Sequence, residues 1–474
     1  MRRPAFASAF VHALLIAALG SGEVRAADTV ETLYAQHCAS CHGENLQGGK
    51  APNLLLGNWQ SAGEAKEAAD MIAEGEGHKF AGKLSPGQIR ALVVLLKERQ
   101  YEEESKGYAL LLESPGGYFE SGTERYRLAT VAKLPSVPWG LSLAPDGSWL
   151  LTLREGQLLM INGSRSTEIK GTPKVAARVQ GGLLDVQPHP DAAANGWIYL
   201  TYSQPSAEGA MTAVVRGKIK GDRWVEQETV FTVPESLHGD AGHHFGSRLA
   251  FAGGYVFFGI GDRGEGEFAQ DLSKPNGKIY RLFDDGRTPP DNPFVKTAGA
   301  LPSIYSYGHR NPQGLAISPE DGSLIESEHG PRGGDEINLI QPGQNYGWPR
   351  VTYGINYEGT PMVEATEGAD FTPPIHYWVP SIAVSAVHFY QGDNFPTWSG
   401  GLLVGSLAKQ ELRLLKLRRG QIVADQLLLK NQGRIRDIAT GPDGLPYLLI
   451  EDDKGGGALV RISPVTTAAG GAQP

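Results

Sequence analysis

Short apolar runs that follow turn residues recur along most of the chain and predict a β-rich protein. In six places a turn rich in Pro, Gly, Asp or Asn leads into such a run. The first proline of the series, Pro145, and the last, Pro442, are 297 residues apart, which is about 59 residues per step. This step is near the length of a propeller blade, in which each four-stranded sheet packs against its neighbours. The six runs lie at residues 149–151, 197–200, 255–258, 323–325, 402–404 and 447–450.

The fold expected for residues 127–463 is therefore a six-bladed β-propeller, and the chain as a whole is expected to be mainly β. The alternative is an ordinary β-sandwich with frequent turns, although one sandwich rarely holds roughly 340 residues. The composition agrees with many tight turns, because 62 of the 474 residues are Gly and 31 are Pro.

The segment before residue 100 has a helical pattern and predicts a small all-α domain at residues 27–100. Ser85 suits the N-cap of its last helix, and Pro86 suits the first helical position. Residues 101–126 show no pattern of a stable element and predict a linker, and residues 464–474 predict a flexible tail. Helices are expected over residues 30–37, 65–74 and 85–99.

The first 26 residues have the pattern of an export signal. Arg2 and Arg3 precede an apolar run at residues 9–19, and Val24-Arg25-Ala26 offers small residues at a cleavage site. A helical membrane anchor is the alternative, but the run is too short to cross a bilayer. We expect a signal peptide at residues 1–26, a periplasmic mature protein and no membrane span.

Charge and cysteine content narrow the function. A net charge of −9 argues against nucleic acid as a partner. Two cysteines are too few for a disulfide scaffold, and both lie in Cys38-Ala-Ser-Cys41-His42. C-x-x-C-H is the attachment motif of c-type haem, in which both thiols bind the porphyrin and His42 ligates the iron. A thioredoxin-like site or a simple disulfide gives no reason for the histidine.

The sixth ligand of this haem iron is less clear from the sequence. The segment before the last predicted helix reads Gly75-Glu-Gly-His78-Lys-Phe80, where a class I cytochrome c usually has a methionine. His78 is the expected distal ligand, while Met71 or an open position are the alternatives. Ligation by two histidines would lower the reduction potential relative to Met/His ligation.

Two segments of the predicted propeller are dense in groups that take part in proton and charge transfer. His243 and His244 lie in a glycine-rich loop, where a histidine can bind a metal ion or act as a general base. Because neighbouring side chains of a strand point to opposite faces, only one of the two is expected to face a site. Arg310, in Gly308-His-Arg-Asn-Pro-Gln-Gly314, offers a planar cation suited to carboxylate or quinone oxygens.

Two further segments suggest ion binding. Residues 328–336 combine glycines, whose carbonyls can point inward, with Asp335, a ligand set that suits Ca²⁺. Arg434 and Arg436 are two residues apart on a predicted strand and share a face, which suits an anion with several carboxylates. A solvated surface pair is the alternative for these arginines.

The segments together resemble the PQQ-dependent soluble aldose sugar and glucose dehydrogenases, whose fold is a six-bladed propeller. The resemblance covers about residues 127–463, and residues 28–100 resemble a class I cytochrome c domain. The propeller motifs are residues 179–185, the His243-His244 loop, and residues 261–262, 308–314, 330–331, 335–336, 345–348 and 434–437.

The resemblance implies a role for each matching residue. His244 resembles the general base for the anomeric hydroxyl, Asp262 its orienting partner, and Gln180 a substrate contact. Arg310 resembles the residue that stabilises charge on the quinone oxygen of PQQ, and Asn311 lies beside it. The remaining implied ligands are Arg434 and Arg436 for PQQ carboxylates, and Gly330, Pro331 and Asp335 for Ca²⁺, with Asp335 either a ligand or a support.

The resemblance also shows departures. Glucose dehydrogenase has a lysine at the place of Ala408, and here Lys409 follows; it has an acid at the place of His243. The broader aldose sugar dehydrogenases are therefore the nearer match.

The function expected is oxidation of an aldose to its lactone, with electrons passed to the fused haem and then to a respiratory acceptor. A binding or scaffolding propeller, or a plain electron carrier, are the alternatives.

Overall fold

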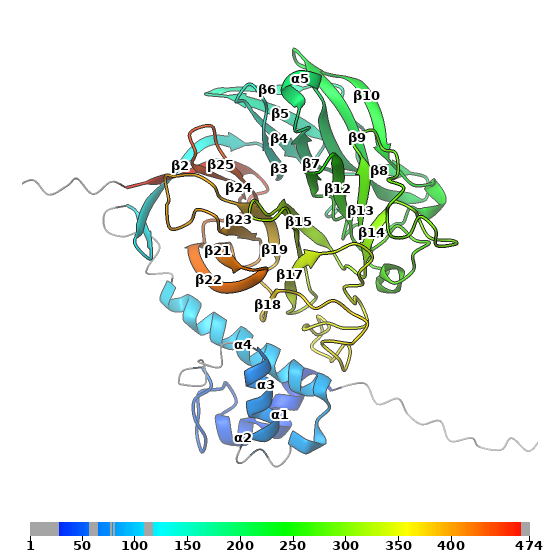
Figure 1. Cartoon of the computed structure of the whole chain (residues 1–474). Coiled ribbons are helices and arrows are strands. Elements are labelled where there is room, and N and C mark those ends of the chain that lie inside the picture. The colour runs from blue at the N-terminus through cyan, green and yellow to red at the C-terminus, as the bar shows by residue number, and fades with distance from the viewer. Residues whose placement is uncertain (1–27, 56–64, 76–77, 79–80, 109–116, 466–474) are drawn as a thin grey trace, which may run out of the picture.

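The chain folds into a large β-propeller with a small helical domain at its side (Figure 1). The computed structural model describes residues 28–55, 65–75, 78, 81–108 and 117–465. The predicted signal peptide at residues 1–26 and nearly all of the predicted tail lie outside the described residues. The predicted fold class, mainly β with a six-bladed propeller and a small all-α domain, is confirmed.

Each blade is an antiparallel sheet, and the first three follow one another along the chain. The first blade consists of β3 (Pro138–Leu143), β4 (Trp149–Leu153), β5 (Gln157–Asn162) and β6 (Arg165–Ile169). The second consists of β7 (Leu183–Pro188), β8 (Ile198–Ser206), β9 (Gly209–Lys220) and β10 (Arg223–Phe231). The third consists of β11 (Leu249–Ala252), β12 (Tyr255–Ile260), β13 (Lys278–Phe283) and β14 (Ile304–Tyr307).

The remaining blades complete the ring. The fourth consists of β15 (Pro312–Ile317), β16 (Leu324–Glu328), β17 (Asp335–Ile340) and β18 (His376–Trp378). The fifth consists of β19 (Val384–Phe389), β20 (Leu402–Ser406), β21 (Glu411–Arg418) and β22 (Gln421–Lys430). The sixth consists of β23 (Arg434–Thr440), β24 (Pro446–Glu451) and β25 (Gly457–Pro464), with β2 (Glu124–Leu134) and β1 (Phe119–Ser121) at its edge.

The sixth blade closes the ring by joining the two ends of the domain. Strand β2 lies before the first five blades in the chain. It nevertheless pairs antiparallel with the last strand, β25, from Tyr126↔Pro464 to Leu134↔Gly457. Backbone hydrogen bonds between the first and last segments of the domain therefore close the ring within the sixth blade.

The six apolar runs expected as strands overlap the second strand of each blade: β4, β8, β12, β16, β20 and β24. The first strands, β3, β7, β11, β15, β19 and β23, contact one another in sequence around the axis. Apolar side chains fill the space between neighbouring sheets, as Tyr126, Phe395 and Trp398 do between the fifth and sixth blades. Because each sheet packs its faces against its neighbours, separate apolar clusters lie between adjacent blades around the ring.

The helical domain confirms the three expected helices. It contains α1 (Val30–His37), α2 (Ala39–His42), α3 (Ala65–Glu74), a 3₁₀ turn at Ala81–Lys83 and α4 (Pro86–Tyr108). Ser85 caps α4 as predicted: its Oγ accepts from Gln88 N at 3.2 Å, while Gln88 Oε1 accepts from Ser85 N at 2.9 Å. The propeller adds a short helix, α5 (Ala192–Asn195), and 3₁₀ turns at Glu235–Leu237 and Gly266–Ala269.

The prediction of no regular element at residues 101–126 is wrong. Helix α4 continues to Tyr108, and β1 and β2 begin at Phe119 and Glu124. Ion pairs at Arg99–Glu102 and Lys106–Glu103 support the extra helical turns, and Tyr101 packs between two lysines of the propeller. Tertiary contact thus extends a helix whose local sequence is highly charged. Among the described helices, none combines the length and apolar character needed to span a membrane.

Candidate active site

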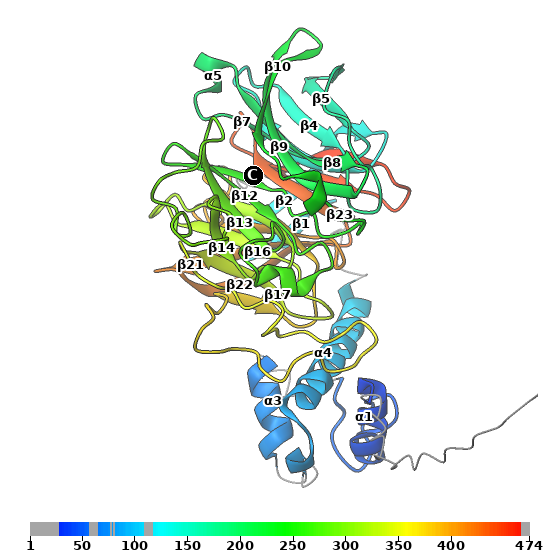
Figure 2. The same cartoon turned by 90° about the vertical axis from the view of Figure 1, so that its right-hand side faces the viewer.

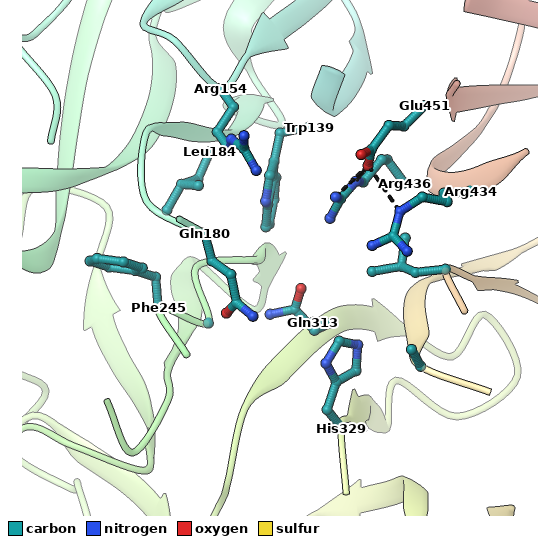
Figure 3. A pocket seen from close by; sticks show the side chains of 13 residues that line it. Trp139, Arg154, Gln180, Leu184, Phe245, Gln313, His329, Arg434, Arg436 and Glu451 are labelled. Atoms are coloured by element: carbon teal, nitrogen blue, oxygen red, sulfur yellow. Dashed lines mark hydrogen bonds and ion pairs between the residues drawn. The ribbon is translucent and has the colours of Figure 1, made fainter. Parts of the chain in front are cut away.

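A cavity of about 340 Å³ lies where the first strands surround the propeller axis (Figure 3). Its size falls in the range of sites for small organic ligands. Trp139 comes from β3, Leu184 from β7, Gln313 from β15, and Arg434 and Arg436 from β23, so four blades contribute to one wall. The other lining residues are Arg154, Gln180, Phe245, Gly246, His329, Ala383, Leu407 and Glu451.

Three arginines make the cavity strongly cationic. Arg434 and Arg436 share a face of β23, and both pair with Glu451, at 3.3 Å and 2.6 Å. Arg154 reaches the same cavity from the turn after β4. Burial lowers the pKa of Arg436 to about 10, so this guanidinium still carries its charge at neutral pH.

His244 lies beside this cavity in an unusual backbone conformation. Its φ is +56°, which a residue with a side chain adopts rarely. Nδ1 of His244 and Oδ1 of Asp262 are 2.6 Å apart, and Trp348 Nε1 donates to the other carboxylate oxygen at 2.8 Å. Gln180 Oε1 accepts from the backbone N of His244 at 2.7 Å, which connects the histidine to the cavity wall.

The electrostatics of this pair suit a proton acceptor. Burial lowers the pKa of His244 below its usual value, even though Asp262 opposes the shift. Burial raises the pKa of Asp262, but the hydrogen bond and charge of His244, the N–H of Gly264 and the charge of Arg310 together outweigh it and lower the pKa. His244 is therefore neutral and Asp262 ionised, so Nδ1 donates to the carboxylate and Nε2 is left as the basic nitrogen.

Arg310 and Asn311 are not among the residues that line this cavity, but both contact segments around it. Arg310 Nη1 donates to the carbonyl of Gly330 at 2.7 Å, and Asn311 Oδ1 accepts from Gly246 N at 3.2 Å. Arg310 Nε and His329 Nε2 are buried and have no hydrogen-bond partner among the described residues. Such atoms are costly unless a ligand or water pairs with them.

The predicted cation loop is tightly folded. A side chain at Gly330 would lie 2.3 Å from the backbone of Gly334, so only glycine fits there. Asp335 is fully buried, and its oxygens accept from Gly330 N at 2.9 Å, Ser381 Oγ at 2.7 Å and Val384 N at 3.1 Å. Asp335 was expected either to bind Ca²⁺ or to support the loop, and these contacts favour the supporting role.

Sequence reasoning missed several residues of the cavity. Trp139, Arg154, Gln313 and Glu451 line it, although only Gln313 lies in a segment that the sequence singled out. His329 was passed over inside the cation loop. One signal was available: Arg154 follows an apolar strand directly, which is where propeller strands leave the sheet for a loop.

The helical domain brings the predicted haem ligands together. The rings of His42 and His78 have centroids 6.3 Å apart. Metal–imidazole bonds are about 2 Å long, so two rings that bind one metal ion from opposite sides have centroids about 6 Å apart. His42 Nδ1 lies 2.8 Å from the carbonyl of Pro52 and His78 Nδ1 lies 3.1 Å from that of Met71, so Nε2 is the nitrogen of each ring that would bind a metal ion.

The cysteines fit haem attachment better than redox chemistry. Cys38 and Cys41 are free thiols and form no disulfide. Burial raises the pKa of Cys38 to about 11, whereas reactive C-x-x-C pairs have a lowered thiol pKa. The side chain of Met71, on α3, is 46% exposed, and its backbone carbonyl lies 3.1 Å from His78 Nδ1. Of the two candidate ligands, His78 is therefore the better placed.

The two domains dock along helix α4 (Figure 2). Arg332, in the cation loop, forms a two-pronged ion pair with Glu98 of α4, with distances of 2.8 Å and 3.0 Å. Near the start of α4, Glu364 accepts from Gly87 N at 2.9 Å. Tyr101 is the residue at which the linker was expected to begin. Lys409 Nζ lies 4.0 Å from the centroid of its ring, so this lysine contacts the helical domain.

These features define a propeller dehydrogenase that carries its own c-type cytochrome. Residues 135–461 match the glucose/sorbosone dehydrogenase family, and residues 25–96 match the subunit III family of cbb3-type cytochrome c oxidase. The chain belongs to the glucose/sorbosone dehydrogenase family of PQQ-dependent sugar dehydrogenases and is an oxidoreductase.

Similar proteins agree with this assignment. The aldose sugar dehydrogenase YliI of Escherichia coli is 43% identical over 337 residues, which cover 69% of this chain and 90% of that protein. A crystal structure of a glucose dehydrogenase matches with a TM-score of 0.67 and 41% identity, over 70% of this chain and 98% of that one. The PQQ-bound aldose sugar dehydrogenase of Streptomyces coelicolor matches with a TM-score of 0.60 and 27% identity, over 73% and 100%.

Proposed function

We propose that this protein oxidises the anomeric hydroxyl of an aldose to the lactone, with hydride transfer to PQQ, and passes the electrons to its own haem. The observation that carries the proposal is the His244–Asp262 pair beside a cavity lined by three arginines. A neutral, carboxylate-oriented histidine accepts a proton, and the arginines suit an anion with several carboxylates.

The residues of the cavity fit PQQ. Arg154, Arg434 and Arg436 supply positive charge to its carboxylates, and Glu451 keeps the last two in place. Trp139 and Phe245 offer apolar faces to a planar ring system. The unpaired Arg310 Nε and His329 Nε2 are donors or acceptors that a bound cofactor would satisfy. When bound, PQQ supplies a quinone that accepts the hydride.

His244 and its neighbours do the proton chemistry. Nε2 of His244 accepts the proton of the anomeric hydroxyl while the hydride leaves the carbon that bears this hydroxyl. Asp262 stabilises the imidazolium that forms. Gln180, which fixes the backbone of His244, is placed to contact the sugar. Arg310 brings fixed positive charge beside the quinone, where negative charge develops.

Calcium and haem complete the proposed cofactors. The carbonyls of Gly330 and Pro331 would hold Ca²⁺ in the tight loop that Asp335 supports, and the ion would polarise the quinone. Cys38 and Cys41 would attach the haem, with His42 and His78 as its axial ligands. A c-type haem bound there would carry one electron at a time, so each two-electron sugar oxidation would need a one-electron respiratory acceptor to reoxidise it between the first and the second electron.

The test is sugar-dependent reduction of the haem in the full chain loaded with PQQ and Ca²⁺. Aldoses should produce the spectrum of reduced haem, and the same samples without PQQ or after chelation of Ca²⁺ should not. A His244→Asn variant should lose the response, while Glu228→Gln, on the outermost strand of the second blade, should keep it. No reduction by any aldose, in protein that dithionite does reduce, would contradict internal transfer.

A second acceptor separates the remaining alternatives. If an artificial dye is reduced by sugar although the haem is not, the propeller is a dehydrogenase with another electron outlet. If neither is reduced, a binding propeller or a plain electron carrier is favoured. The signal pattern of residues 1–26 supports export to the periplasm, which cell fractionation of the full chain would test.

A further inference from the structure

The rim of the proposed site has two unusually exposed apolar side chains. Among the described residues, Val179 and Tyr357 are the most exposed large hydrophobic residues, each at 68%. Val179 directly precedes Gln180, the residue that holds the backbone of His244. The hydroxyl of Tyr357 accepts from Nη2 of Arg310, another residue of the proposed site, at 3.3 Å. Exposure of large apolar groups beside a site points to contact with a ligand.

Tyr357 stands at the tip of a rigid turn. Asn356 N donates to the carbonyl of Thr360 at 3.0 Å, and Gly359 N donates back to the carbonyl of Asn356 at 2.9 Å. The side chain of Asn356 adds a bond to Thr360 Oγ1 at 3.0 Å. Gly359 has φ +90°, a conformation that favours glycine. These bonds fix the backbone of the turn that carries Tyr357.

The helical domain holds this turn in place. The carbonyl of Gly359 accepts from Val30 N, at the start of α1, at 2.9 Å. Ile355 is fully buried in the hydrophobic core of the helical domain. Its backbone pairs in both directions with Arg332, at 3.1 Å and 3.0 Å, and Arg332 is fixed by Glu98. Three anchors on one domain thus position a residue beside the site of the other.

We propose that Tyr357 contacts the sugar at the mouth of the site, and that docking of the haem domain positions it. A sugar ring has an apolar face of C–H groups and an edge of hydroxyls. A tyrosine pairs with both, because its ring is apolar and its tip is polar. Trp348, whose ring lies 5.2 Å from the Arg310 guanidinium carbon, adds a second aromatic surface beside Arg310. Sugar binding and haem-domain docking are then energetically coupled.

The inference rests on the proposed function, and dye-linked activity of the holoenzyme separates the two. A dye acceptor that takes electrons at the propeller reports sugar oxidation without the haem. In Tyr357→Ala, KM for glucose should rise about tenfold while kcat stays within about twofold. Tyr357→Phe should keep most of the affinity, because the ring remains. If the wild type oxidises no sugar, the proposed function fails; if it does and Tyr357→Ala leaves KM unchanged, this inference fails.

A second pair of variants tests the role of the haem domain. Glu98→Gln breaks the ion pair with Arg332 and should raise KM about threefold in the dye assay. Glu228→Gln is the matched control. Glu228 also accepts from two guanidinium nitrogens of one arginine, Nε and Nη2 of Arg216, at 2.9 Å and 2.7 Å, and both residues belong to one blade. Equal KM values in the two variants would overturn the coupling.

Direct binding gives a readout that does not need turnover. Calorimetric titration of the holoenzyme with gluconolactone, the expected product from glucose, should show weaker binding in Tyr357→Ala and Glu98→Gln than in Glu228→Gln. Unchanged haem spectra and unfolding temperatures would show that all three variants are folded. Equal lactone affinity in folded Tyr357→Ala and wild type would contradict the contact.

Discussion

At the scale of single residues, the site depends on how one carboxylate sets the state of one histidine. Asp262 is itself held by Trp348 Nε1 at 2.8 Å and Gly264 N at 2.8 Å. Its position therefore fixes the orientation of His244 and which ring nitrogen carries the proton. Because burial lowers the pKa of His244, the base is neutral at pH values where an ordinary histidine is partly protonated.

We expect Asp262→Asn to reduce kcat by about 10² to 10⁴, because an amide cannot stabilise the imidazolium or fix its tautomer. In the wild type, kcat should persist below the usual histidine pKa of about 6.5 and fall as the pH drops through the lowered value. The variant should lose activity at every pH. Dye-linked rates measured against pH test both points, with Asp285→Asn, a carboxylate on an exposed turn, as the control.

At the scale of elements, strand β13 supports the loop that carries Asp262. Lys278, at the start of β13, is fully buried and donates to the carbonyls of Phe268, Ala269 and Asn276 at 2.8, 3.0 and 2.6 Å. The side chain of Asn276 in turn donates to the carbonyl of Asp262 at 3.0 Å. One side-chain amino group thus ties two backbone segments, the turn at Gly266–Ala269 and Asn276, to the loop of Asp262.

Replacing Lys278 with Met should destabilise the propeller by about 3 kcal/mol, because three buried carbonyls lose their donor. Urea unfolding of the full chain, followed through tryptophan fluorescence, measures the change. Lys133→Met removes an exposed lysine from β2 and should have little effect. A loss of stability no larger than that of Lys133→Met would show that water replaces the ammonium group at no cost.

At the scale of the whole molecule, one arginine joins three blades at the axis. Arg248, just before β11, pairs with Asp185 of β7 at 3.1 Å and Asp437 of β23 at 2.6 Å. Its guanidinium carbon lies 4.3 Å from the ring centroid of Trp139, which lines the cavity. Burial raises the pKa of Asp185 to about 7, while Arg248 opposes this rise. The arginine therefore stabilises two buried carboxylates and braces the cavity wall.

Arg248→Met should cost about 3 to 5 kcal/mol, because it leaves buried carboxylates without their cation. Without the cation the folded pKa of Asp185 rises further above its unfolded value, so folding favours the protonated carboxyl. The loss of stability relative to the wild type should then be smallest at acidic pH. It should grow as the pH rises through the pKa that Asp185 has in the folded wild type. Urea unfolding between pH 5 and pH 8 would show this, where a pH-independent deficit would contradict it.

Adding Asp185→Asn and Asp437→Asn to Arg248→Met should recover part of the loss and flatten the pH dependence, because neutral amides need no cation. This triple variant is the control for simple loss of side-chain volume.

The sequence alone determined the features that depend on local spacing. Strand-forming runs at a regular step predicted the six blades, and Ser85 with Pro86 predicted the start of α4. C-x-x-C-H indicated haem, and the alternation of strand side chains placed Arg434 and Arg436 on one face. These inferences hold because periodicity and short motifs act over a few residues.

Only the tertiary structure decided which distant residues meet. Arg154 and Glu451 reach the cavity from different blades, and no local pattern connects them with Arg436. Tyr101 is a second example, because lysines of the propeller pack over its ring where α4 continues. Lys409 is one of these lysines. Tyr357 gains its position from Val30 and Glu98, far away in the chain. Packing between domains created these contacts, and a sequence read one segment at a time does not contain them.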